Sequence, residues 1–310
     1  MSPWMRPSTL DFFRRAKAKK NYPVTEWLHG WFYIRFPYAY IGNGLGARQP
    51  VKLWLRLRAL WRRWFPPKAA PEGASNGGLT WAEGYHGKVI PLQAAREWVT
   101  VREPIAAALP EQVIPFQHAR DMILEMPDHL ALLDCPCRAA RENPCLPLDV
   151  CLIVGEPFVS MVVEHHPQRS RRVSSAEALA VLEAEERRGH VHHAFFKEAL
   201  LGRFYAICNC CSCCCGAMQA QRNGTPMLIA SGYRAQVEED LCAGCGECEA
   251  VCPFGAISTA AGTAQVNAAA CMGCGVCVSH CPQEALALVL DPQKGAPLEV
   301  HSLISAPPSC

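Results

Sequence analysis

The chain has 310 residues, half of them hydrophobic, which is enough for two or three domains of ordinary size. Its net charge of +2 hides a split, because residues 1–70 hold 14 Lys/Arg against two acids, whereas residues 232–295 are acidic overall. No window of about 18 apolar residues free of charge is present and no signal peptide follows Arg14-Arg15, so neither a spanning helix nor secretion is expected. A reducing cytoplasm is the expected location.

Residues 51–65 predict a basic amphipathic helix that ends at Pro66-Pro67. At 100° per residue, its leucines and tryptophans share one face, and Lys52, Arg56 and Arg63 lie opposite. Three alternatives stay open for this helix: peripheral contact with the inner face of a membrane, docking to a partner protein, or packing on the chain's own middle domain. Nucleic acid is not an expected partner, because no recognised binding module accompanies the aromatic stretches.

Between this segment and the C-terminal cysteine repeat, the sequence predicts a mixed α/β domain. Apolar runs at 129–134, 150–154 and 203–208 indicate strands, each close to a cysteine. Ser174 and Glu177 form a capping box that opens a helix ending near Gly189.

Nineteen cysteines stand in short-spaced runs along the chain. Because the chain is long and the count is odd, a complete disulfide framework is not expected. Short spacings instead suit ligands that converge on a metal or a cluster.

A repeat stands out near the C-terminus. The stretch from Cys242 to Pro253 matches the stretch from Cys271 to Pro282, and each reads C-x2-C-x2-C-x3-C-P. The first three cysteines of each copy lie on a tight loop and can hold three corners of one cubane, while the fourth follows on a short helix and ligates the other cluster. Zinc would need only two C-x2-C pairs, with no use for the third cysteine and the proline.

This crossing assigns the ligands of two [4Fe–4S] clusters. One cluster takes Cys242, Cys245, Cys248 and Cys281, and the other takes Cys271, Cys274, Cys277 and Cys252.

On these eight cysteines and two prolines, the segment resembles the bacterial-type dicluster ferredoxins. The resemblance implies a domain with pseudo-two-fold symmetry, single-electron transfer at low potential, and two clusters close enough to exchange electrons. The expected fold class is therefore α+β: this ferredoxin-type domain, the cysteine-rich middle domain and the N-terminal helical segment. The expected divisions are 1–65, the linker 66–78, the middle domain 79–232, the dicluster domain 233–295, and a tail 296–310.

Ten further cysteines lie in the middle domain. They are Cys135, Cys137, Cys145, Cys151, Cys208, Cys210, Cys211, Cys213, Cys214 and Cys215. Six thiols within eight residues are not a core-packing pattern, so these cysteines predict a third metal centre, with Cys135, Cys137, Cys145 and Cys151 as one four-ligand possibility. An additional Fe–S cluster, a zinc site and a thiol redox site stay open here.

The Cys135-Pro-Cys137-Arg138 element and the Cys208-Asn-Cys-Cys element, combined with the repeat, are similar to a poorly characterised family of bacterial multi-cluster iron–sulfur proteins. That resemblance implies a multi-cluster redox protein without naming its reaction.

The favoured function is electron transfer to a partner oxidoreductase. The alternatives are a catalytic iron–sulfur reductase with its active site at the middle cysteines, and a metal- or cluster-handling protein. No Rossmann fingerprint or phosphate loop points to a nucleotide. His165-His166 and the histidines from His190 to His193 are interpreted as surface residues or as metal ligands.

Overall fold

The computed structural model describes residues 5–45, 81–260 and 262–304. The helix expected at 51–65, the linker expected at 66–78, and Cys310 lie outside these residues. Within the described ranges the chain is α+β, as the sequence predicts.

A central sheet of nine strands forms the middle of the molecule. Its strands are β1 Tyr85–Ile90, β2 Ile105–Ala108, β3 Asp121–Leu124, β4 Leu130–Asp134, β5 Asp149–Val154, β6 Ser170–Val173, β7 Val191–Lys197, β8 Arg203–Cys210 and β9 Leu228–Ile229. The main path runs β6-β4-β5-β8-β7-β1-β9, and β3 joins β8 and carries β2 on its other side. The pairs β1–β9 and β3–β8 are parallel. The predicted strands at 129–134, 150–154 and 203–208 are confirmed as β4, β5 and β8.

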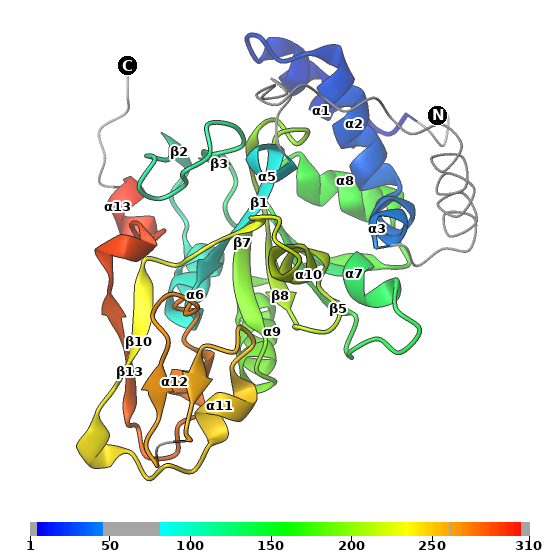
Figure 1. Ribbon diagram of the computed structural model, residues 1–310. Helices are drawn as coiled ribbons and strands as arrows, with labels where there is room; N and C mark the ends of the chain where they lie inside the picture. Colours follow the sequence, from blue (N-terminus) through cyan, green and yellow to red (C-terminus); the bar gives the residue numbers. More distant parts are fainter. Residues whose placement is uncertain (1–4, 46–80, 261, 305–310) are drawn as a thin grey trace, which may run out of the picture.

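Helices cover both faces of this sheet (Figure 1). One face carries α1 Pro7–Ala18, α2 Val24–Arg35, α3 Pro37–Gly44, α8 Phe158–His165 and α10 Gly216–Arg222. The other face carries α6 Leu92–Thr100, α9 Ser175–Arg187 and α13 Val300–Ile304. Two short helices, α5 Trp81–Gly84 and α7 Pro136–Ala139, lie at strand ends. The predicted capping box of α9 is confirmed, with Ser174 Oγ accepting from the Glu177 N–H at 3.2 Å.

The two cores follow from the alternation of side chains along each strand. In β5, Cys151 and Ile153 point into the core beneath α1, α2 and α8, while Leu152 and Val154 point into the core beneath α6 and α9. Both faces of the strand are therefore apolar, and its cysteine belongs to the first core.

The described part of the N-terminal segment packs on the chain's own sheet. Phe12, Ala16, Tyr33 and Ile34 are buried in the first core. Ser8 Oγ donates to Glu164 Oε2 of α8 at 2.6 Å. No helix within the described ranges has both the length and the apolar character needed to cross a bilayer.

A smaller unit follows the sheet, at the opposite end of the molecule from α1 and α2 (Figure 1). It contains β10 Tyr233–Val237, α11 Glu247–Val251, β11 Ile257–Ser258, β12 Gln265–Val266, α12 Val276–Ser279 and β13 Leu286–Leu290, with 3₁₀ turns at Glu239–Leu241 and Pro292–Lys294. The strand that begins each repeat pairs antiparallel with the strand that ends the other repeat, as β10–β13 and β12–β11. This reciprocal pairing gives the unit its pseudo-two-fold symmetry.

After β13 the chain returns to the second core. Leu298 and Val300 are buried there, and Lys88 Nζ donates to the Ala296 carbonyl at 2.9 Å. A Cβ at Gly232 would lie 2.6 Å from the Pro297 nitrogen, so the two connections to the smaller unit lie against each other. The sequence does not predict this packing of residues 296–304.

Candidate metal centres

The eight cysteines of the repeat lie around two pockets. The first pocket is lined by Cys242, Cys245, Cys248 and Cys281. The second is lined by Cys271, Cys274, Cys277 and Cys252. Each pocket thus combines three cysteines of one copy with the fourth cysteine of the other copy.

Glycines let the cysteine loops fold closely around these pockets. A Cβ at Gly244 would lie 2.1 Å from the Gly262 carbonyl oxygen, and a Cβ at the equivalent Gly273 would lie 2.1 Å from the Tyr233 carbonyl oxygen. Any side chain at these two positions would collide with backbone, which explains why glycine stands in both copies.

Backbone N–H groups point at the ligand sulfurs. Four such hydrogen bonds are present, from Ala264 to Cys242 (3.3 Å), Ala235 to Cys271 (3.5 Å), Ala256 to Cys252 (3.2 Å) and Ala285 to Cys281 (3.3 Å). Ala235 in β10 and the equivalent Ala264, directly before β12, thus each donate to the first cysteine of the other copy. Such donors stabilise a negatively charged cluster and raise its potential.

The two pockets differ in exposure. Cys245 in the first pocket is exposed, whereas Cys271, Cys274 and Cys277 in the second pocket are buried. Burial raises the pKa of Cys277 to about 12, so this thiol needs a bound cation to become a thiolate. Four soft sulfur donors, glycine turns and backbone donors at each pocket fit a cubane cluster.

The ten middle cysteines separate into two sets. The first, here called the Cys145 set, contains Cys145, Cys211, Cys213 and Cys214. The second, here called the cavity set, contains Cys135, Cys137, Cys151, Cys208, Cys210 and Cys215, which line one cavity. Cys211 of the Cys145 set also lines this cavity.

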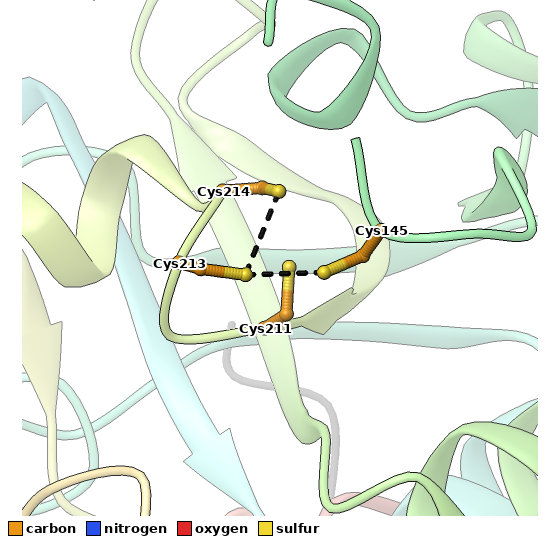
Figure 2. Close-up of side chains that lie close together, drawn as sticks. All are labelled: Cys145, Cys211, Cys213 and Cys214. Carbon is orange, nitrogen blue, oxygen red and sulfur yellow. Dashed lines mark hydrogen bonds between the residues drawn. The ribbon is translucent and has the colours of Figure 1, made fainter. Parts of the chain in front are cut away.

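The Cys145 set gathers four sulfurs from two segments. Figure 2 shows the Sγ atoms of Cys211, Cys213 and Cys214, which follow β8, turned toward Cys145 from the loop after α7. All four atoms lie within 4.8 Å of one another, and the Cys145–Cys213 distance is 3.1 Å.

The cavity set lies on the sheet face covered by α2 and α3. Cys151 and Cys208 are cross-strand neighbours with sulfurs 3.8 Å apart, and Cys210 and Cys215 are 3.2 Å apart. A hydrogen bond with Cys137, followed by burial, raises the pKa of Cys135 to about 12. With its pKa raised, the free thiol of Cys135 stays protonated at neutral pH and is a poor nucleophile.

Most of the remaining cavity wall is aromatic or apolar, and Arg138 and Asn209 are its polar members. The hydroxyls of Tyr33 and Tyr205 lie 2.9 Å apart, and the Lys197 ammonium lies 4.7 Å from the Tyr33 ring and 4.8 Å from the Tyr85 ring. Burial lowers the pKa of Lys197 to about 8.

This division corrects the four-ligand possibility of Cys135, Cys137, Cys145 and Cys151. Cys135 directly follows β4, Cys151 lies on the paired strand β5, and both line the cavity together with Cys137. Cys145 lies on the loop that joins these strands, and this loop carries it to the turn after β8. Spacing along the chain is a poor guide here because the partners of Cys145 are far away in sequence.

Arg138 has a structural role. Its buried guanidinium pairs with Glu185 of α9 and donates to the carbonyls of Pro147 and Asn209. Burial is the largest single influence and lowers the pKa of Arg138, but the hydrogen bond to Glu185 and the charges of nearby acidic groups together outweigh burial, so the pKa is raised. The residue therefore ties α9 to β8 and to the loop before β5.

The conspicuous histidines mostly make structural hydrogen bonds. His165 bonds Thr9 at 2.8 Å, His166 bonds the Ile34 carbonyl at 2.6 Å, and His192 bonds Asn209 at 2.6 Å. In the part of the chain that the structure describes, the one close group of metal-type ligands contains cysteines alone.

Residues 234–282 match the family model described as a 4Fe-4S dicluster domain. No curated protein matches the chain. The match agrees with the resemblance to dicluster ferredoxins, and a domain of this kind indicates iron–sulfur electron transfer.

Proposed function

We propose that this chain carries low-potential electrons through two [4Fe–4S] clusters in its C-terminal unit and delivers them to a further metal centre at the cavity set. In this proposal one cluster is held by Cys242, Cys245, Cys248 and Cys281, and the other by Cys252, Cys271, Cys274 and Cys277. When bound, such clusters supply reversible one-electron transfer.

The observation that carries this proposal is the position of the second pocket. Cys274 and Val276 belong to the same apolar core as Cys210 and Cys215 of the cavity set. The second pocket is therefore joined to the cavity set by packed side chains. The first pocket, with its exposed Cys245, is the side at which a partner protein can approach.

Contacts between α12 and α9 hold the C-terminal unit in this position. Ser279 Oγ donates to Glu186 Oε1 at 2.6 Å, and Val276 is fully buried. His280 Nε2 lies 3.3 Å from the Arg187 carbonyl. These contacts fix the orientation in which electrons would leave the C-terminal unit.

Charge supports a direction for the transfer. Glu247 and Glu249 open α11 beside the exposed pocket, and the 3₁₀ turn before Cys242 adds Glu239 and Asp240. A redox partner with a basic surface would be attracted to this end of the unit. The opposite pocket faces the chain's own core.

Iron and sulfide quantitation, with EPR of the reduced protein, tests the proposal on the full chain prepared without oxygen. Two cubanes alone require about eight iron atoms, and a further cluster at the cavity set raises the count to about twelve or more. The double variant Cys135→Ser, Cys151→Ser should then lose only the additional iron and its EPR signal. A wild-type count of about eight, unchanged in the variant, would remove the cavity set from the electron path.

A catalytic reductase is the second candidate, favoured by the space beside the cavity set. The Tyr205 hydroxyl in the cavity wall and the Lys197 ammonium beside the tyrosines can hold or move a proton near bound substrate. Reduced protein should then be reoxidised by small apolar oxidants only while the cavity is open to them. Filling the cavity with Ala206→Leu should block that reoxidation and leave oxidation at the exposed pocket unchanged.

A further inference from the structure

The Cys145 set lies apart from both pockets of the C-terminal unit, and it borders the cavity set through Cys211, which also lines the cavity. Cys213 is exposed, Cys145 is partly exposed, and Cys211 and Cys214 are buried. In Figure 2 the four sulfurs point at a common centre, three from the turn after β8 and one from the loop after α7.

The spacing of these sulfurs fits a single metal ion. A tetrahedral ion with metal–sulfur bonds of about 2.3 Å places its sulfurs about 3.8 Å apart. The Cys213–Cys214 distance is 3.7 Å, the Cys145–Cys213 distance is 3.1 Å, and no pair exceeds 4.8 Å. All four cysteines are free, so no disulfide holds them together.

The same spacing does not fit a cubane. In a [4Fe–4S] cluster each cysteine binds a different iron at a different corner, so its sulfurs are held much farther apart than around one ion. Consistent with this, neither C-terminal pocket gathers its cysteines this closely: among the described residues, the Cys145 set is the one such group.

Side-chain hydrogen bonds hold the conformation of the turn that carries three of the four cysteines. Arg141 Nη2 donates to the Cys214 carbonyl at 3.1 Å, Gln219 Nε2 to the Cys213 carbonyl at 2.7 Å, and Arg222 Nη2 to the Ser212 carbonyl at 2.5 Å. Arg141 also donates to Gln219 Oε1 at 2.7 Å. These bonds orient the ligand loop, and the two guanidinium groups offset the charge of four thiolates.

We propose that Cys145, Cys211, Cys213 and Cys214 bind one zinc ion in a closed tetrahedral site. Four protein thiolates leave no open position, so the site is structural. It joins the loop before β5 to the turn after β8, and both segments also carry members of the cavity set. This site goes beyond the proposed electron path and needs no electron transfer of its own.

Zinc K-edge X-ray absorption on the full chain tests the coordination directly, because iron in the C-terminal unit does not contribute at that edge. The expected result is one zinc per chain with four sulfur neighbours at about 2.3 Å. Zinc with nitrogen or oxygen neighbours, a single iron in place of zinc, or no zinc at all would overturn the proposal.

Paired variants separate this site from the proposed electron path. Cys145→Ser with Cys213→Ser should remove the zinc and leave the iron count and the EPR spectrum unchanged. The matched control, Cys135→Ser with Cys151→Ser, should keep the zinc. Loss of iron rather than zinc from the first variant would assign the Cys145 set to a cluster and overturn the proposal, whatever the control shows for the cavity set.

Discussion

The two copies of the cysteine repeat share their spacing and differ in their surroundings. Cys245 is exposed in the first copy, and the equivalent Cys274 is buried in the second. The residue two positions after each of them is Glu247 in the first copy and the fully buried Val276 in the second. The cysteines therefore define the pockets, while the residues between them decide which copy faces solvent and which packs on the sheet.

The largest expected effect comes from breaking the crossing between the copies. Cys281→Ser should remove the cluster of the exposed pocket, and Cys252→Ser that of the buried pocket, so each variant should lose about four iron atoms. An iron chelator should bleach the cluster that remains in Cys252→Ser quickly and the one that remains in Cys281→Ser slowly. The reverse order of bleaching would show that the fourth cysteine serves its own copy.

Giving the second copy the polarity of the first should undo its packing. Val276→Glu places an unpaired charge in a fully buried site and should lower the free energy of unfolding by on the order of 3–5 kcal/mol. Denaturant unfolding without oxygen measures this. The matched change in the exposed copy, Glu247→Val, should change the free energy of unfolding by no more than about 0.5 kcal/mol. Equal losses of stability in the two variants would mean that both copies are equally exposed.

A smaller effect is expected at the hydrogen bond between the second copy and α9. Ser279→Ala leaves the buried Glu186 carboxylate without its 2.6 Å donor and should cost about 1–3 kcal/mol in thermal unfolding. Ala250→Ser, at the equivalent exposed position, is the control. A neutral Ser279→Ala would mean that the apolar contact alone holds the unit.

The smallest effect concerns the acidic face of the first copy. Glu247→Lys should slow oxidation of the reduced protein by the cation hexaammineruthenium(III) roughly two- to tenfold at low salt. The difference should vanish at high salt, where charges are screened. Stopped-flow absorbance measures the rates, and the anion ferricyanide should respond in the opposite direction. A rate independent of this charge would place the site of oxidation elsewhere.

Sequence reasoning succeeded where chemistry is local. The spacing of cysteines within each C-x2-C-x2-C-x3-C-P stretch determines which cysteines share a loop and which one follows on the short helix. The grouping of three cysteines of one copy with the fourth of the other therefore follows from the spacing. The capping box at Ser174 and the apolar runs of β4, β5 and β8 are also local signals.

The contacts that the sequence could not predict join distant segments. Cys145 meets Cys213 only because the sheet brings the loop before β5 beside the turn after β8. Leu298 follows a stretch rich in proline and glycine, and nothing near it in sequence indicates that it enters the second core. In both cases tertiary structure decides which residue is the contact partner, and the periodicity of apolar residues along the sequence does not predict that partner.

Two contacts near the connections of the C-terminal unit bear on the rate of electron transfer: Gly232 packs against Pro297, and Lys88 donates a hydrogen bond to the Ala296 carbonyl. Ferredoxin units on long tethers must search by diffusion before each transfer, and their speed then depends on linker length and viscosity. Here both connections of the unit are clamped to the sheet at one point. In the electron path that we propose, the distance from the second pocket to the cavity set is thus fixed by the folded chain, and transfer along this path should have the same rate in dilute buffer and in a viscous solution.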